Sequence, residues 1–258
     1  MSVLCVLPAR VSSERIPQKP LQILAGHPLI EWSWRAARRV PSFDHVWVAT
    51  DSEEVAATVE SFGGKAVLTD PERPSGTDRV AEAARRIGVR EGDIVVNFQA
   101  DEPFADPSTV ARAVEVVRQG APACTVAAPI LSTREWESPS VVKVVVAGDG
   151  RALYFSRAGV PRPRDGGGPG SGEPSRFLRH VGIYAFGSAT LDRWIGLGPS
   201  RLERIEGLEQ LRVLEAGVEM RVVVGPATEP GVDEPPDLER ARKYLHLEKG
   251  KNGSERDV

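Results

Sequence analysis

Several features that define common protein classes are missing from this 258-residue sequence. It has no run of about eighteen apolar residues, which excludes a transmembrane helix. Its start, MSVLCVLPAR, places the first arginine after the apolar run and so lacks the basic beginning of a signal peptide. The two cysteines, Cys5 and Cys124, lie in apolar runs, and the four histidines are scattered. We therefore expect reduced core thiols in a cytoplasmic protein, without a metal site built from cysteine and histidine.

An excess of basic charge is also missing. The chain has 36 acidic and 33 basic residues, which gives a net charge of −3. This balance lacks the basic footprint of a nucleic-acid binder, so we expect neither a nucleic-acid partner nor membrane insertion. A composition that is 41% apolar and 27% charged is ordinary for a globular protein and excludes wholesale disorder.

What the sequence does have, up to Gly120, is an alternation of strand-like and helix-like segments. The predicted strands are 3–7, 44–50, 65–68 and 93–99, and the predicted helices are 28–40, 51–63, 77–87 and 106–120. Asp51 and Glu54 have the spacing of a capping box at the start of the second helix, and Asp106-Pro107 predicts the start of the fourth. The alternation predicts an α/β fold with a mostly parallel, Rossmann-like sheet covered on both faces.

After residue 122 the pattern changes to closely spaced strands. Gly148-Asp149-Gly150 joins two of them and indicates a hairpin, so we predict an antiparallel excursion over about 122–187. The Pro- and Gly-rich segment 160–176 predicts a mobile loop, and 205–216 predicts one helix with an apolar face. We expect a single domain over 1–247 and a disordered tail over 248–258.

Ligands of open α/β sheets bind at the carboxyl ends of the strands, so the loops there are the place to look. The loop 8–20 follows the first strand and carries Arg10, Arg15 and Lys19. It contains no glycine, which excludes both the dinucleotide-binding turn and the Walker loop. Cations on a proline-stiffened loop suit a polyphosphate. The alternative is a solvated basic loop.

Two acidic residues also follow predicted strands. Asp101 comes directly after the fourth strand, and Asp233 lies just before the last predicted helix, 236–247. Asp106 already serves as a helix cap, which leaves Asp101 for another role, whereas Asp233 alone could be a turn or cap residue. Carboxylates shared with phosphates are suitable ligands for Mg²⁺, so a metal site is plausible.

A series of motifs in order along the chain resembles the CMP-Kdo synthetases, the 3-deoxy-manno-octulosonate cytidylyltransferases. The motifs are PARVSSERIPQKPL at 8–21, VATD at 48–51, PSGTDR at 74–79, VNFQADEP at 96–103, VKVV at 142–145, LYFSRAGVP at 153–161, RHVGIYAF at 179–186, LEQLRVLEAG at 208–217 and GVDEPPDLER at 231–240. The resemblance runs from Val3 to about Arg242. It implies a glycosyltransferase-A-like nucleotidyltransferase fold whose antiparallel excursion forms a homodimer.

The resemblance also implies roles for individual residues. The implied nucleotide-binding residues are Arg10, Arg15, Lys19, Ser75, Gly76 and Arg79, and the implied Mg²⁺ ligands are Asp101 and Asp233. The residues implied to bind the sugar acid are Gln99, Arg157, Arg164, His180, Tyr184, Glu209 and Gln210. Those implied to act in catalysis are Arg10, Lys19, Asp101 and Asp233.

The implied reaction transfers the cytidylyl group of CTP to the anomeric hydroxyl of 3-deoxy-D-manno-octulosonate (Kdo), for lipopolysaccharide synthesis. Ala100 stands where the family has glycine, Pro74 stands where it often has His or Gln, and 162–165 reads RPRD where it has roughly WDRD. The last departure leaves open another 2-keto-3-deoxy sugar acid, of the amino-Kdo or sialic type. A non-catalytic nucleotide-sugar binding module is the more distant alternative.

Overall fold

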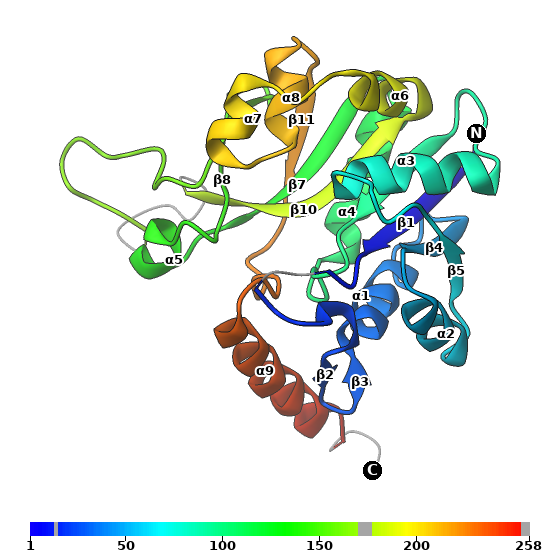
Figure 1. The fold of residues 1–258 in the computed structure, drawn as a ribbon. Helices are drawn as coiled ribbons and strands as arrows, with labels where there is room; N and C mark the ends of the chain where they lie inside the picture. The colour runs from blue at the N-terminus through cyan, green and yellow to red at the C-terminus, as the bar shows by residue number, and fades with distance from the viewer. Residues whose placement is uncertain (13–14, 170–176, 254–258) are drawn as a thin grey trace.

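The apolar segments form the centre of an α/β fold. The computed structural model describes residues 1–12, 15–169 and 177–253, with backbone alone from 248 onward. Within these residues, a sheet of nine strands has the order β11-β7-β10-β6-β1-β4-β5, and β8 joins it through β10 and pairs with β9 (Figure 1). The strands are β1 (Val3–Ala9), β2 (Ile23–Leu24), β3 (His27–Pro28), β4 (His45–Thr50), β5 (Lys65–Leu68), β6 (Ile94–Phe98), β7 (Ala123–Pro129), β8 (Lys143–Val146), β9 (Ala152–Ser156), β10 (Leu178–Gly187) and β11 (Met220–Val224).

Helices cover both faces of the sheet, as the sequence predicts. They are η1 (Lys19–Leu21), α1 (Leu29–Arg38), α2 (Glu53–Ser61), α3 (Gly76–Ile87), α4 (Pro107–Arg118), α5 (Thr133–Glu137), α6 (Ser188–Gly196), α7 (Arg201–Glu206), α8 (Gln210–Glu215) and α9 (Pro235–Gly253). Buried side chains of α1, α2 and α4 form one apolar cluster with the sheet, and those of α3, α6 and α8 form another on its opposite face. Burial of apolar surface on both faces accounts for the continuous apolar character of β1, β6 and β7.

The sheet is mostly parallel, and its antiparallel pairings involve strands of the predicted excursion. β1 pairs in parallel with β4 and β6, β4 pairs in parallel with β5, and β7 pairs in parallel with β11. β10 runs antiparallel to both β6 and β7, and β8 and β9 form the predicted hairpin. Of the predicted excursion, β7 therefore belongs to the parallel set, because it has the same direction as β6 and β11.

Two helical predictions are wrong in detail. Ser52, rather than Asp51, caps α2, since its hydroxyl accepts a hydrogen bond from the Val55 N–H. The segment 205–216 is not one helix: it breaks between α7 and α8, where Gly207 has a φ of +63°. Ile205, expected on the apolar face, is 68% exposed.

The C-terminal helix packs against the N-terminal part of the chain. α9, orange to red in Figure 1, lies beside β2, and a cluster including Ile16, Leu29, Val232 and Leu238 joins them. This packing brings the residues before α9 next to the basic loop after β1. The helix continues past Leu247, where the ordered chain was predicted to end; residues 254–258 lie outside the described part. No helix among the described residues has the length and apolar character needed to span a membrane.

Candidate active site

Four of the five charged residues on which the metal and phosphate predictions depend lie together: Arg15, Lys19, Asp101 and Asp233. Lys19 Nζ lies 2.5 Å from Asp101 Oδ2 and 3.2 Å from Asp233 Oδ1, and Arg15 lies 3.2 Å from the same Asp233 oxygen. Asp101 follows β6 and Lys19 belongs to the loop after β1. The two strands are parallel neighbours, so both loops leave the same edge of the sheet.

Backbone contacts bring Asp233 to Asp101. The Val232 N–H donates a 2.9 Å hydrogen bond to the carbonyl of Asp101. A Cβ on Gly231 would lie 2.8 Å from that carbonyl oxygen, so this close approach requires glycine. Arg240 of α9 donates to the carbonyls of Pro230 and Gly231 and holds the same loop from its other side.

The electrostatics of this group are those of a tightly packed charge cluster. Burial and the neighbouring Asp101 carboxylate raise the pKa of Asp233. Burial alone lowers the pKa of Lys19, but the carboxylates of Asp101 and Asp233 outweigh it, and the net pKa is raised. The lysine is therefore a permanent cation between two carboxylates.

A cavity of about 450 Å³, called the smaller cavity below, lies on one side of this cluster. All six residues predicted to bind nucleotide line it: Arg10, Arg15, Lys19, Ser75, Gly76 and Arg79. Ser75 caps α3, since its hydroxyl accepts from the Asp78 N–H. A Cβ on Gly76 would lie 3.1 Å from Gln99 Nε2, so the backbone at the start of α3 forms a close-packed wall.

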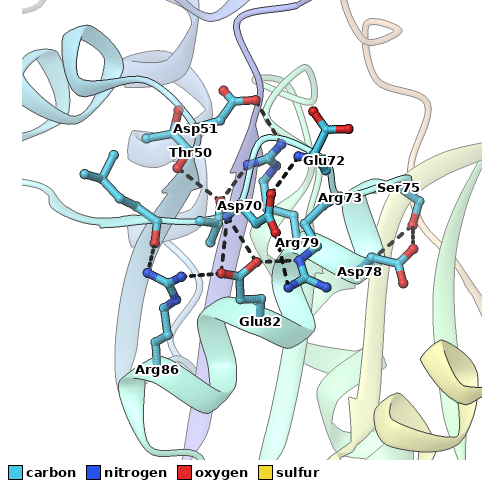
Figure 2. Close-up of polar contacts among 12 residues, drawn as sticks. Thr50, Asp51, Asp70, Glu72, Arg73, Ser75, Asp78, Arg79, Glu82 and Arg86 are labelled. Atoms are coloured by element: carbon cyan, nitrogen blue, oxygen red, sulfur yellow. Dashed lines mark hydrogen bonds and ion pairs between the residues drawn. The ribbon is translucent and has the colours of Figure 1, made fainter.

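Arg79 lines the smaller cavity, but its guanidinium is already paired with residues of the protein. It is 2% exposed, and its guanidinium donates to Thr69 at 2.6 Å and to the Asp51 carboxylate at 3.0 Å (Figure 2). The other oxygen of Asp51 accepts from the Val11 N–H at 3.3 Å. Arg79 thus connects α3 to the basic loop through Asp51, which explains why Asp51 does not cap α2. Its predicted contact with a nucleotide stays a prediction.

A second cavity, called the larger cavity below, has a volume of about 810 Å³ and adjoins the first. The predicted sugar-binding residues that line it are Gln99, Arg157, His180, Tyr184, Glu209 and Gln210. Both cavities are lined by Arg15, Gln99, Asp101, Gly207, Glu209 and Asp233. The two carboxylates therefore lie where the cavities join.

The break between α7 and α8 decides the position of Glu209. Its carboxylate accepts from the Thr77 hydroxyl at 2.8 Å, and that hydroxyl in turn accepts from the Asn97 amide at 3.0 Å. Burial raises the pKa of Glu209. Neither Thr77 nor Asn97 was predicted as a site residue, although each lies inside a motif that carries the family resemblance.

The two predicted sugar-binding arginines have different positions. Arg157 lines the larger cavity and donates to the backbone carbonyls of Pro139, Glu206 and Gly207, which ties the strand end to the helix break. Arg164 is exposed and lines neither cavity, so the structure does not bring it to the site. Residues 170–176 of the predicted mobile loop lie outside the described part of the chain.

The sequence reasoning missed charged residues in the wall of the larger cavity. Glu102 and Arg179 are both buried, and the Glu102 carboxylate accepts from the Gly182 N–H at 2.9 Å. Burial raises the pKa of Glu102 to about 7, against the opposing influence of Arg179. The only signal in the sequence was the adjacency of these residues to Asp101 and His180, because burial of a charged side chain cannot be read from the motifs.

The carboxylates of Asp101 and Asp233 suit a divalent cation whose other ligands are water or phosphate oxygens. No cluster of three or more histidine, cysteine, aspartate or glutamate side chains suitable for a metal exists among the described residues. Asp101 and Asp233 nevertheless converge on a single cation, the Lys19 ammonium, and so offer carboxylate oxygens to one point. Mg²⁺ is commonly held by one or two carboxylates plus substrate phosphates, so these residues fit it.

Comparison with known proteins agrees with this arrangement. The profile of the cytidylyltransferase family matches residues 4–221, and the chain belongs to that family. A protein of Syntrophobacter fumaroxidans named 3-deoxy-manno-octulosonate cytidylyltransferase is 43% identical over 93% of this chain and 95% of its own length. One of the same name from Anaeromyxobacter sp. strain K is 46% identical over 94% of this chain and 97% of its own. Within the cytidylyltransferases, the chain belongs to the 3-deoxy-manno-octulosonate cytidylyltransferase family.

A solved structure has a fold similar to that of this chain. It is described as CMP:2-keto-3-deoxy-manno-octonic acid synthetase complexed with CTP, and it is 40% identical to this chain. The alignment covers 96% of this chain and all of the other, with a TM-score of 0.85. This confirms the predicted α/β fold with a mostly parallel sheet and additional antiparallel strands.

Proposed function

We propose that this protein transfers the cytidylyl group of CTP to the anomeric hydroxyl of Kdo and releases CMP-Kdo and pyrophosphate. The observation that carries the proposal is the junction of the two cavities at Asp101 and Asp233. Two substrates, one in each cavity, would meet beside the charged cluster. The membership of the chain in the Kdo cytidylyltransferase family supports the assignment of the substrates.

CTP would occupy the smaller cavity. Arg10, Arg15 and Lys19 supply cations for its triphosphate, and the close-packed backbone at Gly76 suits the approach of a flat base. Lys19 and Arg10 would offset the charge that develops on the leaving pyrophosphate. Because the cations belong to a loop held by Asp51 and α9, this charge stabilisation is organised before the reaction begins.

Mg²⁺ would bind at Asp101 and Asp233. The bound ion would supply positive charge next to the reacting phosphate and lower the pKa of the attacking hydroxyl. The side chains contribute the two carboxylates, and Lys19 and Arg15 limit the net negative charge that these carboxylates create.

The sugar acid would occupy the larger cavity. His180, Tyr184, Glu209 and Gln210 form a wall of hydrogen-bonding groups suited to hydroxyls, and they place the anomeric oxygen toward the junction. That oxygen attacks the α-phosphorus in line, the bond from this phosphorus to the pyrophosphate oxygen breaks, and the hydroxyl proton is lost to solvent. No covalent intermediate with the protein is required.

The test is release of pyrophosphate from CTP in the presence of a panel of 2-keto-3-deoxy sugar acids. We expect Kdo to be the best substrate and CTP to be used well above ATP or GTP, because the family resemblance implies a pyrimidine-sized pocket for the base around Ser75–Arg79. Preference for an amino-Kdo or sialic-type acid would assign the alternative substrate. Equal turnover with a purine triphosphate, or tight nucleotide-sugar binding without turnover, would contradict the proposal.

Three further properties are proposed with this function: a homodimer, a location in the cytoplasm and a role in lipopolysaccharide synthesis. Leu131 and Leu153 are exposed by 58% and 55% in the excursion, which supports a homodimer that covers them. Sedimentation should give a dimer at micromolar concentration, and a monomer would contradict this. A location in the cytoplasm is supported by Cys5 and Cys124, which are free and buried thiols. The product would serve lipopolysaccharide synthesis.

A further inference from the structure

The larger cavity has a buried threonine behind its wall. Thr125 of β7 is fully buried and is not a lining residue of either cavity. Its hydroxyl oxygen lies 2.8 Å from His180 Nε2 and 2.7 Å from the backbone oxygen of Ile183. The two contacts share one hydroxyl hydrogen, and this restricts which partner can donate.

The chemistry of the partners decides the direction of both hydrogen bonds. A carbonyl oxygen can only accept, so the Thr125 hydrogen points to Ile183. The hydroxyl oxygen must then accept from His180, which places a hydrogen on Nε2. Ile183 lies where the regular pairing of β10 with β7 is interrupted, so the hydroxyl supplies a donor where the sheet ladder does not. If the hydrogen of the ring were on Nδ1 instead, Nε2 and the Ile183 carbonyl would both be acceptors, and the single hydroxyl hydrogen of Thr125 could be donated to only one of them.

The remaining ring nitrogen of His180 is free to act on a ligand. Burial, with the nearby Arg179 cation, lowers the pKa of His180 to about 3, so the ring is neutral near pH 7. A neutral ring with its hydrogen on Nε2 has a lone pair on Nδ1. No hydrogen bond to Nδ1 comes from any residue that the structure describes, and His180 is one of the residues that line the larger cavity.

Aromatic neighbours keep the ring plane in place. Phe155 contacts the ring edge-on at 5.0 Å, and Tyr184 lies at 5.1 Å, between ring centroids. Rotation of the ring by half a turn would place a ring carbon where Nε2 now lies. That rotation would break the hydrogen bond to Thr125. The hydroxyl therefore selects both the tautomer and the orientation of the ring.

We propose that Thr125 is a positioning residue that holds His180 as the Nε2–H tautomer, so that Nδ1 accepts a hydrogen bond from a hydroxyl of the sugar acid. The part that concerns the sugar rests on the proposed function; the tautomer does not. The site then presents a hydrogen-bond acceptor at Nδ1, whereas the other tautomer would present a donor there. A ligand with a hydroxyl at this point is favoured over one that carries only an acceptor there.

The tautomer is tested by long-range ¹H–¹⁵N correlation spectra of the dimer or monomer as purified, without substrates. The chain has four histidines, and His180→Gln identifies the signal of interest. We expect wild-type protein to show protonated Nε2 and unprotonated Nδ1. Thr125→Val, which keeps the shape and removes the hydroxyl, should lose this preference, and Thr125→Ser should keep it. An Nδ1–H or charged ring in the wild type, or an unchanged ring in Thr125→Val, would overturn the proposal.

The contact with the sugar is tested by kinetics with CTP and Kdo. Thr125→Val should raise the KM for the sugar acid about two- to tenfold, as expected for one weakened hydrogen bond, while the KM for CTP stays constant. Thr125→Ser should restore the KM for the sugar acid. If the spectra behave as expected but the sugar KM of Thr125→Val is normal, the role of Nδ1 in sugar binding is wrong. Failure of the proposed function itself would instead appear as absence of turnover in the wild type, with the spectra unaffected.

Discussion

The two cavities differ in the kind of side chain that they offer to a ligand. The smaller cavity presents cations on loops, and the Arg15 side chain there is 51% exposed. The larger cavity presents buried groups on a strand and at a helix break: Tyr184 and Gln210 are 3% and 2% exposed. One ligand would be held by cations on loops, and the other by buried groups of fixed direction, some of them charged.

The difference follows from what each ligand demands. A triphosphate carries several negative charges, so the positive charge of the loop is the main requirement for binding it. A polyhydroxylated sugar acid differs from its isomers only in the direction of its hydroxyls, and discrimination then requires groups with fixed direction. Fixed direction requires burial and packing, which β10 and the α7–α8 break provide.

Arg79 should be structural although it lines the charged cavity. Arg79→Met strands the Asp51 carboxylate, whose side chain is only 10% exposed, and should lower the free energy of unfolding by about 3–5 kcal/mol. Urea denaturation measures this. Arg85→Met is the control, because it breaks a pair in which Arg85 and Asp192 are 57% and 69% exposed, and should cost at most about 1 kcal/mol. Normal stability of Arg79→Met with weakened CTP binding would show instead that its charge serves the nucleotide.

Asp101 should matter for the reaction more than for the fold. Asp101→Asn weakens a proposed ligand of the Mg²⁺ ion and should lower kcat about a hundredfold or more, with little change in melting temperature. Asp106→Asn is a matched control, since asparagine also caps helices and Asp106 caps α4. It should leave kcat normal. A near-normal kcat of Asp101→Asn at low Mg²⁺ would remove Asp101 from the metal site.

The neutrality of His180 should appear in the pH dependence of stability. Its pKa is about 3 in the folded protein and about 6.5 in the unfolded chain, so the unfolded chain binds more protons below pH 6.5. Stability is therefore fully present above pH 6.5 and declines as the pH falls. Between pH 6.5 and 5, wild type should lose about 1–2 kcal/mol more than His180→Gln. Parallel pH profiles of unfolding for the two proteins would contradict a neutral, buried ring.

The smallest effect is expected at Gln210, where one hydrogen bond to the sugar is at stake. Gln210→Ala should raise the KM for the sugar acid about two- to tenfold and leave the KM for CTP unchanged. Gln119→Ala, an exposed change at the end of α4, serves as the control. Thermal melting separates binding from folding. A collapse of stability with unchanged kinetics of the surviving fraction would show that Gln210 only fills the core.

Sequence reasoning succeeded where structure depends on neighbours in the chain. The strands β1, β4, β5 and β6 lie where apolar runs predicted them, and Asp106 caps α4 as its position before proline indicated. Sequence reasoning failed where a residue distant in the chain binds a side chain that the local pattern assigns to another role. Asp51 and Ser52 are both good cap residues, and only the position of Arg79 decides that Ser52 caps α2.

The break at Gly207 has the same origin. The apolar spacing of 205–216 is helical, and Leu208 and Leu211 are indeed buried, but Arg157, directly after β9, donates hydrogen bonds to the carbonyls of Glu206 and Gly207. A local pattern contains no information about that arginine. The break is also what directs Glu209 to Thr77, so an error in the helix prediction concerned the site itself.

By itself the sequence determined the class of fold, the alternation of the strands β1, β4, β5 and β6 with helices, and the residue types gathered at the strand ends, because these depend on apolar periodicity and on local backbone preferences. Only the tertiary structure decided which of those residues meet. Lys19, Asp101 and Asp233 come together because β1 and β6 are parallel neighbours and α9 packs against β2. Arg79 pairs with Asp51, and Thr125 sets the hydrogen of His180, since Arg79 and Thr125 are buried and their polar groups must find partners within the protein.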